Sequence, residues 1–189
     1  MANDTSDTVT PIVTATGAPL KPITVGRFPD AIVISPDGKT LYVQGPAGTV
    51  MPISTATSAA GPPIPGTSGA GQLSMAISPN GKTLIAGDFE QGAVTVINLA
   101  TRHASPPIPL AGGTPFQIAV SPDSARAYVA TGNVVTPIRP ASGQALRAIP
   151  TGPGDFAIAI TPDGTLAYTA NYTSGTATAI RIPAGSPRH

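Results

Sequence analysis

The sequence predicts an all-β protein, a chain of four-stranded antiparallel units repeated about four times with a period of ~42 residues. Three observations predict this class. One tetrapeptide recurs along the 189 residues, strand-forming residues surround each copy, and the 23 Pro and 21 Gly fall mainly where strands would end. Many short strands closed by Pro and Gly turns explain this composition.

The composition also limits the function. Because 41% of the residues are apolar and the mean hydropathy is +0.17, the chain has a core to bury, unlike a disordered polymer. The net charge is +1 and no basic residues cluster, so we expect no nucleic-acid partner. No apolar run reaches the ~18 residues of a membrane span, so we expect no membrane insertion. With no Cys, disulfides and thiolate chemistry are excluded.

The recurring tetrapeptide has the residues of a tight turn. Its copies, spaced 43, 43 and 40 residues apart, are Ser35-Pro36-Asp37-Gly38, Ser78-Pro79-Asn80-Gly81, Ser121-Pro122-Asp123-Ser124 and Thr161-Pro162-Asp163-Gly164. Proline fixes φ, Asp or Asn tolerates the bend and Gly accepts positive φ, so we assign these residues a structural role. Because Ser124 replaces the glycine, we expect a looser or bulged third turn. Repeats of this period, filled with strand-like segments, are typical of β-propeller blades.

Each unit then contains four strands in order. The first precedes the turn and alternates large and small residues, as expected at the crowded centre of a propeller (32–34, 75–77, 118–120 and 158–160). The second follows the turn (41–43, 84–86, 127–129 and 167–169), and the third comes next (49–53, 93–97, 134–138 and 176–180). The fourth is short and proline-rich, which protects an outer edge (63–65, 107–109 and 148–150).

Two sets of residues mark special positions in this pattern. Pro52 and Pro137 lie inside third strands, so their nitrogens should face away from a neighbouring strand or sit at a bulge. A glycine stands nine residues before each tetrapeptide, where the chain crosses to the next blade: Gly26, Gly69, Gly112 and Gly152. A sharp change of direction at the crossing favours glycine.

These repeats resemble those of the YVTN-type β-propeller repeat proteins, which are close in fold to lactonase-like and quinoprotein-like propellers. The matching segments are 112–123, Tyr128-Val129-Ala130-Thr131, Tyr168-Thr169-Ala170-Asn171, Gly48-Thr49-Val50 and Thr55-Ala56-Thr57. The resemblance covers nearly the whole chain and implies a fold rather than an activity. It also implies export or a cell-surface location. The first ten residues do not have the features of a signal peptide, so the residues taken without the resemblance predict a cytoplasmic location.

We interpret residues 1–189 as one propeller or half-propeller domain, with repeats at 1–26, 27–69, 70–112, 113–152 and 153–189, the first and last being partial. Residues 2–12 align with 170–180 at an offset of 168, which is four periods of 42, so the chain begins inside a blade. The N-terminal outer strand could pair with the three C-terminal strands and close four blades. Alternatively, a homodimer could form an eight-bladed ring, or the sequence could belong to a longer propeller.

Few residues have the pattern of a catalytic or metal site. Gly38-Lys39-Thr40 lacks the preceding glycine of a phosphate-binding loop, and His103 and Glu90 are interpreted as solvated loop residues. A histidine metal site would need partners that this sequence does not offer. We therefore predict no catalytic residue, no metal ligand and no cofactor.

The candidate binding residues are polar, do not repeat, and precede the first strands: Arg27, Asp30, Gln72, Gln117 and Asp155. Loops that enter the innermost strands surround one mouth of a propeller channel, so these side chains could converge there. The simpler interpretation is that the acids are solvated and that Phe28, Phe116 and Phe156, in the same stretches, pack between blades.

The leading hypothesis for function is a non-enzymatic scaffold or binding module that presents this loop face to a protein, a glycan or a small ligand. It rests on near-identical repeats without an inserted catalytic constellation. The alternative is a lactonase- or lyase-like enzyme with a divalent cation such as Ca²⁺ in the channel.

Overall fold

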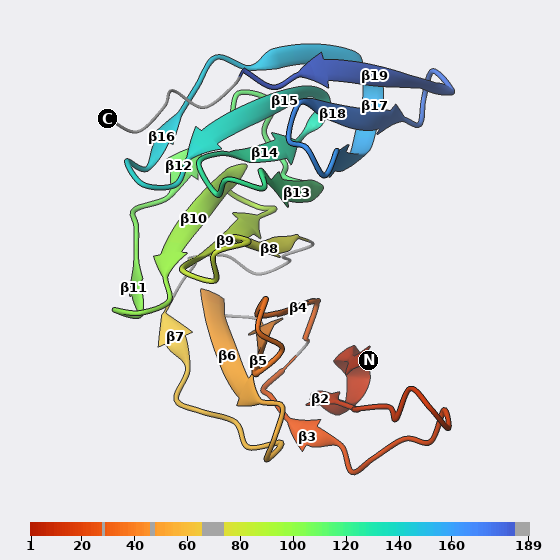
Figure 1. Cartoon of the computed structure of the whole chain (residues 1–189), viewed down its shortest axis with the longest axis vertical. Helices are drawn as coiled ribbons and strands as arrows, with labels where there is room; N and C mark the ends of the chain where they lie inside the picture. The colour runs from red at the N-terminus through yellow and green to blue at the C-terminus, as the bar shows by residue number, and fades with distance from the viewer. Residues whose placement is uncertain (28, 46–47, 66–73, 184–189) are drawn as a thin grey trace.

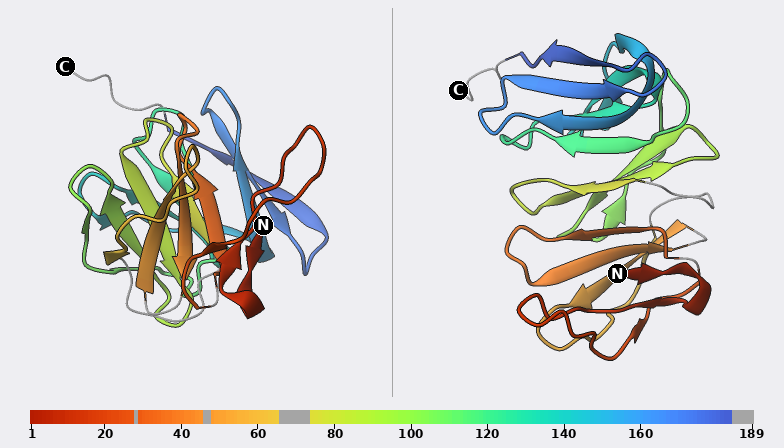
Figure 2. Two further views of the ribbon diagram at one scale, coloured as in Figure 1. Left: turned by 90° about the horizontal axis from the view of Figure 1, so that it is seen from below. Right: turned by 90° about the vertical axis from the view of Figure 1, so that its right-hand side faces the viewer.

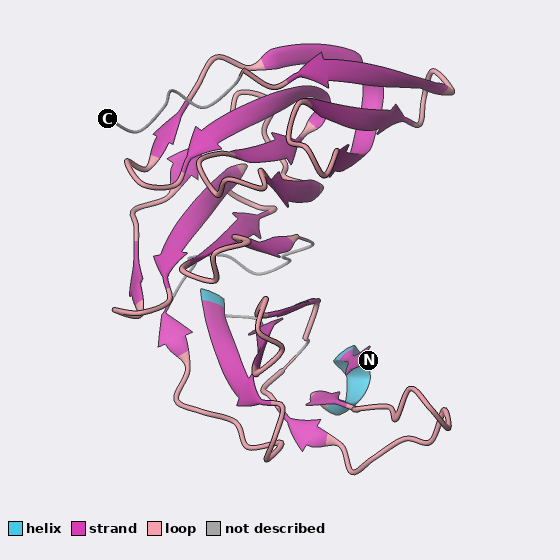
Figure 3. Cartoon of the chain, viewed as in Figure 1, coloured by secondary structure: helices cyan, strands magenta, loops and turns pink. Residues whose placement is uncertain are grey.

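The computed structural model describes residues 1–27, 29–45, 48–65 and 74–183, and in these residues the regular structure is almost entirely strand (Figure 3). Short 3-10 segments are the exception, among them η1 (Asp4–Ser6). The all-β class predicted from the sequence is therefore confirmed. Phe28, Gly69 and Gln72 lie outside the described residues, so the predictions for them stay predictions.

The strands follow the repeat order. The N-terminal sheet contains β1 (Ala2–Asn3), β2 (Thr8–Val9) and β3 (Ile23–Thr24). Blade 1 contains β4 (Ala31–Ile34), β5 (Thr40–Gly45), β6 (Thr49–Ser54) and β7 (Ile64–Pro65). Blade 2 contains β8 (Met75–Ile77), β9 (Thr83–Asp88), β10 (Ala93–Asn98), β11 (His103–Ala104) and β12 (Ile108–Pro109). Every pairing in these sheets is antiparallel.

The last two units share one strand. Blade 3 contains β13 (Gln117–Val120), β14 (Ala127–Ala130), β15 (Gly132–Arg139) and β16 (Gln144–Ala145), and its outer partner is the start of β17 (Ile149–Ile160). The rest of β17 is the innermost strand of the C-terminal blade, followed by β18 (Leu166–Asn171) and β19 (Thr176–Arg181). The predicted crossing between these blades is therefore a continuous, irregular strand rather than a loop.

The sheets stack one after another along a curved, propeller-like arc (Figures 1 and 2). The innermost strands β4, β8, β13 and β17 contact one another in that order, while β7, β11, β12 and β16 lie on the convex side. The N-terminal sheet and the C-terminal blade lie at opposite ends of the arc, and β3 pairs with β2. The described residues therefore do not show the closed four-bladed ring that was one expectation.

The core lies between consecutive sheets and is divided into one apolar cluster for each junction. Val9 and Val25 of the N-terminal segment pack on Val43 and Ile53 of blade 1. The next clusters join blade 1 to blade 2 through Ala31, Val50, Ile64, Met75, Leu84, Ala86 and Ile97, and blade 2 to blade 3 through Ile85, Val94, Val96, Ile108, Leu110, Ile118, Ala127, Val129 and Ile138. Each sheet is thus stabilised mainly by packing on the sheet or sheets next to it, as in repeat proteins generally.

The tetrapeptide turns have one geometry, including the third. In the first copy, the Ser35 hydroxyl donates to Asp37 Oδ1 at 2.6 Å, and the Lys39 N–H donates to the same oxygen at 3.0 Å. The hydrogen bond from the fourth residue's N–H to the first residue's carbonyl is 2.8 Å in all four turns. The expected looser turn at Ser124 is therefore wrong. Ser124 itself takes positive φ, at 60°, in the region that glycine occupies in the other copies.

These hydrogen bonds also act on the turn carboxylates. The serine or threonine hydroxyl lowers the pKa of the aspartate in each turn, with a further contribution from the backbone N–H two residues on (Asp37, Asp123 and Asp163). Asn80 accepts equivalent bonds from Ser78 and Lys82 at 2.7 and 3.0 Å without carrying a charge. Geometry rather than charge is therefore what the motif shares, in agreement with its structural role.

The third-strand prolines lie where no ladder donor is needed. The carbonyls of Pro52 and Pro137 accept bonds of 2.8 Å from the N–H groups of Gly61 and Leu146 in the outer segments. At the equivalent Val96, the N–H binds the Ser105 side chain at 3.1 Å rather than a backbone carbonyl. Proline at this position therefore removes no bond of the backbone ladder.

Candidate binding face at the loop end

The antiparallel order of the strands places two kinds of loop at the same end of every sheet. One kind connects the second and third strands, and the other leads into the first strand of the next blade. We call this end the loop end. The tetrapeptide turns and the connections from third to fourth strands lie at the opposite end, called the turn end. The predicted binding residues that the structure describes belong to segments at the loop end: Arg27, Asp30, Gln117 and Asp155.

Two of the predicted residues share a hollow at the loop end. The hollow has a volume of about 280 Å³ and lies where β4, β8 and β13 begin, and its lining includes Asp30, Ser74, Phe116 and Gln117. Asp30 is exposed, and its backbone N–H is bonded to the Gln44 carbonyl at 3.1 Å. The carboxylate of Asp30 is therefore presented to solvent by a fixed backbone.

Gln117 also has a structural role. Its Oε1 accepts the backbone N–H of Ile158 at 2.7 Å, so the side chain of one innermost strand bridges to the next. Arg27 is exposed and lies at the same end of the molecule. The hollow therefore has both Asp30 and Gln117 in its lining, and Arg27 belongs to the same crossing segment as Asp30.

Asp155 lies beneath this surface rather than on it. Its side chain is fully buried, and Oδ2 accepts a hydrogen bond from the Thr151 hydroxyl at 2.6 Å. Oδ1 has no partner with regular hydrogen-bond geometry in the described part of the chain. Burial raises the pKa of Asp155 above the usual carboxyl range, and the Thr151 hydroxyl opposes this shift. Asp155 therefore supports the loop end from inside and is not available to a ligand at the surface.

Four aromatic rings form a contiguous row across the loop end. Phe116 contacts Phe89 and Phe156 edge-on, with ring centroids 6.4 and 4.5 Å apart, and Phe156 contacts Tyr172 at 6.0 Å. Phe89 follows β9, Phe116 precedes β13, Phe156 lies in β17 and Tyr172 follows β18, so three blades contribute. The exposed fractions are 41% for Phe89, 43% for Phe156 and 82% for Tyr172.

The simpler interpretation of the sequence was that the phenylalanines pack between blades, and the aromatic row differs from it in its exposure to solvent. Phe116 and Phe156 pack against each other between neighbouring blades, yet their cluster remains open to solvent at the loop end. Phe89 and Tyr172 were not among the candidates identified from the sequence. Both stand outside the repeat pattern in loops between second and third strands, and that was the signal available to find them.

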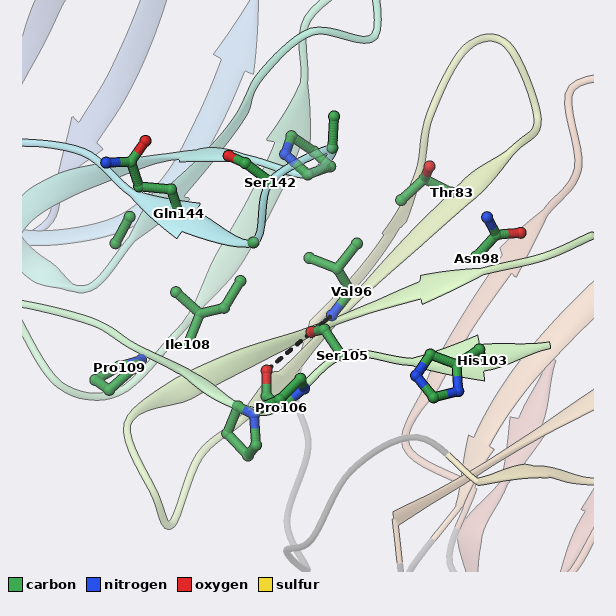
Figure 4. A pocket seen from close by; sticks show the side chains of 15 residues that line it. Thr83, Val96, Asn98, His103, Ser105, Pro106, Ile108, Pro109, Ser142 and Gln144 are labelled. Atoms are coloured by element: carbon green, nitrogen blue, oxygen red, sulfur yellow. Dashed lines mark hydrogen bonds between the residues drawn. The ribbon is translucent and has the colours of Figure 1, made fainter. Parts of the chain in front are cut away.

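A second hollow lies on the outer side of blades 2 and 3 (Figure 4). It has a volume of about 810 Å³ and is lined mainly by prolines and small polar residues, with His103 at one side. The Ser105 hydroxyl there donates to the Pro106 carbonyl at 2.8 Å and accepts the Val96 N–H at 3.1 Å. Ser105 is therefore held by the backbone, in the manner of a structural residue.

The described residues contain neither a metal-ligand cluster nor a membrane-spanning helix. Among them, no three His, Cys, Asp or Glu side chains are grouped so that they could hold a metal ion. No helix in the described part of the chain is long and apolar enough to cross a membrane.

Comparison with known proteins gives a fold but no family. No family model matches the sequence, and no curated protein matches it. A solved structure of Kuenenia stuttgartiensis hydrazine synthase is 22% identical, with a TM-score of 0.56, over 97% of this chain and 80% of that one. A functionally unknown protein from Desulfotomaculum acetoxidans is 19% identical, with a TM-score of 0.82, over 96% of this chain and 61% of that one.

The chain thus spans about three fifths of the length of the second protein. At these identities the likeness concerns the fold alone. The curled series of antiparallel sheets and the two similar structures together identify a propeller-like all-β fold.

Proposed function

We propose that this chain is a non-enzymatic binding module whose loop end receives a protein, a glycan or a small ligand. The observation that carries the proposal is the aromatic row of Phe89, Phe116, Phe156 and Tyr172. We interpret the sequence repeats that form this surface as YVTN-type repeats.

The exposure of the row supports a role in recognition. Tyr172 buries little of its ring within the protein itself, whereas aromatic side chains contribute much of the binding energy of interfaces. The chain has only four Phe and four Tyr, so four rings in one contiguous row are a concentration of its aromatic surface. A ligand can therefore cover apolar area by stacking on this row.

Polar groups near the row supply the second element of a binding site. The hollow that contains Asp30 and Gln117 also includes Phe116, so it adjoins the row directly. Apolar surface with a few fixed polar groups is the usual composition of a ligand site. Hydrogen bonds to the Asp30 carboxylate would then orient a ligand that stacks on the rings.

The proposal is tested with the whole chain, screened against a glycan array and a displayed peptide library. We expect at least one ligand whose affinity falls about tenfold or more in the double variant Phe156→Ala/Tyr172→Ala, because each stacked ring contributes about 1 kcal/mol or more. His103→Ala, at the turn end, is the matched control and should leave the affinity unchanged.

Two results would contradict the proposal. One is a set of ligands that bind the double variant and the parent chain equally well. The other is the lack of any ligand in both libraries. Equal unfolding midpoints for the parent chain and the double variant are needed to assign a loss of affinity to the row.

A further inference from the structure

The third strand of the C-terminal blade has an open outer edge. The third strands β2, β6, β10 and β15 each pair with an outer strand, namely β3, β7, β12 and the start of β17. Within the described residues, β19 pairs with β18 alone and forms the edge of its sheet (Figure 1). Unpaired backbone groups along such an edge are a template for another strand.

The other blades show which backbone groups bond to the outer edge of a third strand. In each of them, one third-strand carbonyl accepts the N–H of the residue nine positions later: Leu20 to Pro11 at 2.9 Å, Gly61 to Pro52 at 2.8 Å, Ser105 to Val96 at 2.8 Å and Leu146 to Pro137 at 2.8 Å. The outer strand then places an isoleucine eleven positions after the last isoleucine of the third strand, as in Ile12 and Ile23.

The flat face of the same blade is also uncovered. Tyr168 is 45% exposed, whereas its repeat counterpart Tyr128 is 1% exposed because the C-terminal blade covers it. Around Tyr168, five exposed alanines continue this face on three neighbouring strands: Ala157, Ala159, Ala170, Ala177 and Ala179. At the internal junction the corresponding Ala130 and Val135 are fully buried. This face therefore has the residues of a blade junction, and no other strand of the described residues packs on it.

The N-terminal end of the same chain carries the matching element. Asn3 Nδ2 donates to Thr8 Oγ1 at 3.1 Å and to Thr10 Oγ1 at 2.8 Å. Asn171 Nδ2 donates to Thr176 and Thr178 at the same two distances. The hairpin β1–β2 and the hairpin β18–β19 are thus equivalent pieces of structure.

This equivalence means that one hairpin can take the place of the other. The hairpin β1–β2 pairs with β3, and Val9 covers blade 1 at Val43 and Ile53. The longer hairpin β18–β19 offers Ala177 at the position of Val9 and adds Tyr168 to the covering surface. It could therefore cover the same face of blade 1 with three strands instead of two.

We propose that the open end of the C-terminal blade docks on the N-terminal end of a second copy of this chain. In this complex β19 of one copy pairs with β3 of the other around Ile23, and the Tyr168 face packs on blade 1 of the other copy in place of its β1–β2 hairpin. Two copies exchange these elements reciprocally and complete a ring of eight blades. The interface is uncharged across its alanine face, which suits burial against apolar residues.

The test compares two proline variants in the whole chain by light scattering coupled to gel filtration, from about 1 to 200 µM. Ala179 stands at the position of Pro11, Pro52 and Pro137, so Ala179→Pro should keep the association. The N–H of Ala177 points to the same open edge, two residues earlier, and would bond to β3. Because that N–H is unused by β18, Ala177→Pro should fold normally and weaken dimerisation at least tenfold.

The expected mass of the parent chain at high concentration is twice 18.7 kDa. A mass of 18.7 kDa at every concentration, a series of larger assemblies, or equal dimerisation of Ala177→Pro and Ala179→Pro would overturn the proposal. If Ala177→Pro does not fold, a peptide of residues 20–26 replaces it. That peptide should dissociate the dimer, and the same peptide with Ile23→Asp should not. Dissociation by neither peptide or by both would overturn the proposal.

Discussion

At the scale of single residues, Asp155 combines burial with an incomplete set of hydrogen bonds. Its carboxyl group is fully buried and accepts a side-chain hydrogen bond from the Thr151 hydroxyl at 2.6 Å. Burial raises the pKa of this carboxyl, so the folded protein binds a proton more readily than the unfolded chain does. The stabilisation from protonation is complete below the ordinary carboxyl pKa of about 3.9 and is lost as the pH rises through the raised folded-state value.

Asp155→Asn should therefore stabilise the protein at neutral pH, by about 1 kcal/mol, because it removes a buried charge and keeps an acceptor for Thr151. The measurement is the free energy of unfolding in urea at pH 4, 5.5 and 7 for the parent chain and the variant. The advantage of the variant should grow with pH. A difference that is constant or that shrinks as the pH rises would show that Asp155 does not titrate in this way.

The crossing glycines are explained by close packing as well as by chain direction. Gly26 has positive φ, at 95°, as expected for a sharp turn. Gly112 instead lies against Thr131, where an added Cβ would meet the threonine Oγ1 and would lie 2.7 Å from its Cβ. Gly152 is packed in the same way against Asn171, with Cγ at 2.8 Å. The sequence indicated that the crossings favour glycine. Which side chain packs against each glycine depends on the fold.

Gly112→Ala should consequently destabilise the protein by about 1–3 kcal/mol, through overpacking against Thr131. The matched variant is Gly112→Ala/Thr131→Gly. It removes the threonine side chain that the new alanine Cβ would meet, and should recover part of the lost stability. Urea unfolding of the two single variants and the double variant gives the coupling energy. Additive effects of the two substitutions would contradict the proposed contact.

At the scale of the elements, the third strands explain where proline is tolerated. Val96 binds a side-chain hydroxyl through its N–H, whereas Thr95 lies opposite Ala86 with its N–H on the side of β9. Val96→Pro should therefore cost about 1–2 kcal/mol, the value of one hydrogen bond and some packing. Thr95→Pro removes a ladder bond between two buried strands and should cost about 3 kcal/mol or more.

Circular dichroism during urea unfolding distinguishes these two proline variants. The result expected is a folded Val96→Pro and a strongly destabilised or unfolded Thr95→Pro. Similar losses of stability in both variants would mean that the outward orientation of Val96 is wrong.

The elements were the most predictable level of this molecule. Alternating apolar residues and periodic turns indicated the strands because those signals are local. The turn at Ser124 was misjudged because a serine can occupy positive φ when the surrounding bonds hold it, as the 2.8 Å bond to Ser121 does. The continuity of β17 across Gly152 and Gly154 depended on pairing with β15 and β18, which a local pattern does not reveal.

At the scale of the whole molecule, the candidate site could be predicted only in part. The order of strands indicated which loops share an end, and so brought Asp30 and Gln117 into one region. The depth of Asp155 and the contact between Phe116 and Phe156 depend on how each blade is rotated against the next. Such rotations are set by the packing of the junction clusters, and no repeat pattern fixes them.

The central claim is that successive blades turn about a common axis and so bring distant loops together at one face. A nuclear Overhauser measurement between aromatic protons tests it, and the four Phe and four Tyr make assignment practical. We predict a strong Phe116–Phe156 contact, with rings 4.5 Å apart, and weaker Phe89–Phe116 and Phe156–Tyr172 contacts at 6.4 and 6.0 Å. A spectrum with no contact between Phe116 and Phe156 would contradict both the arrangement of the blades and the proposed binding face.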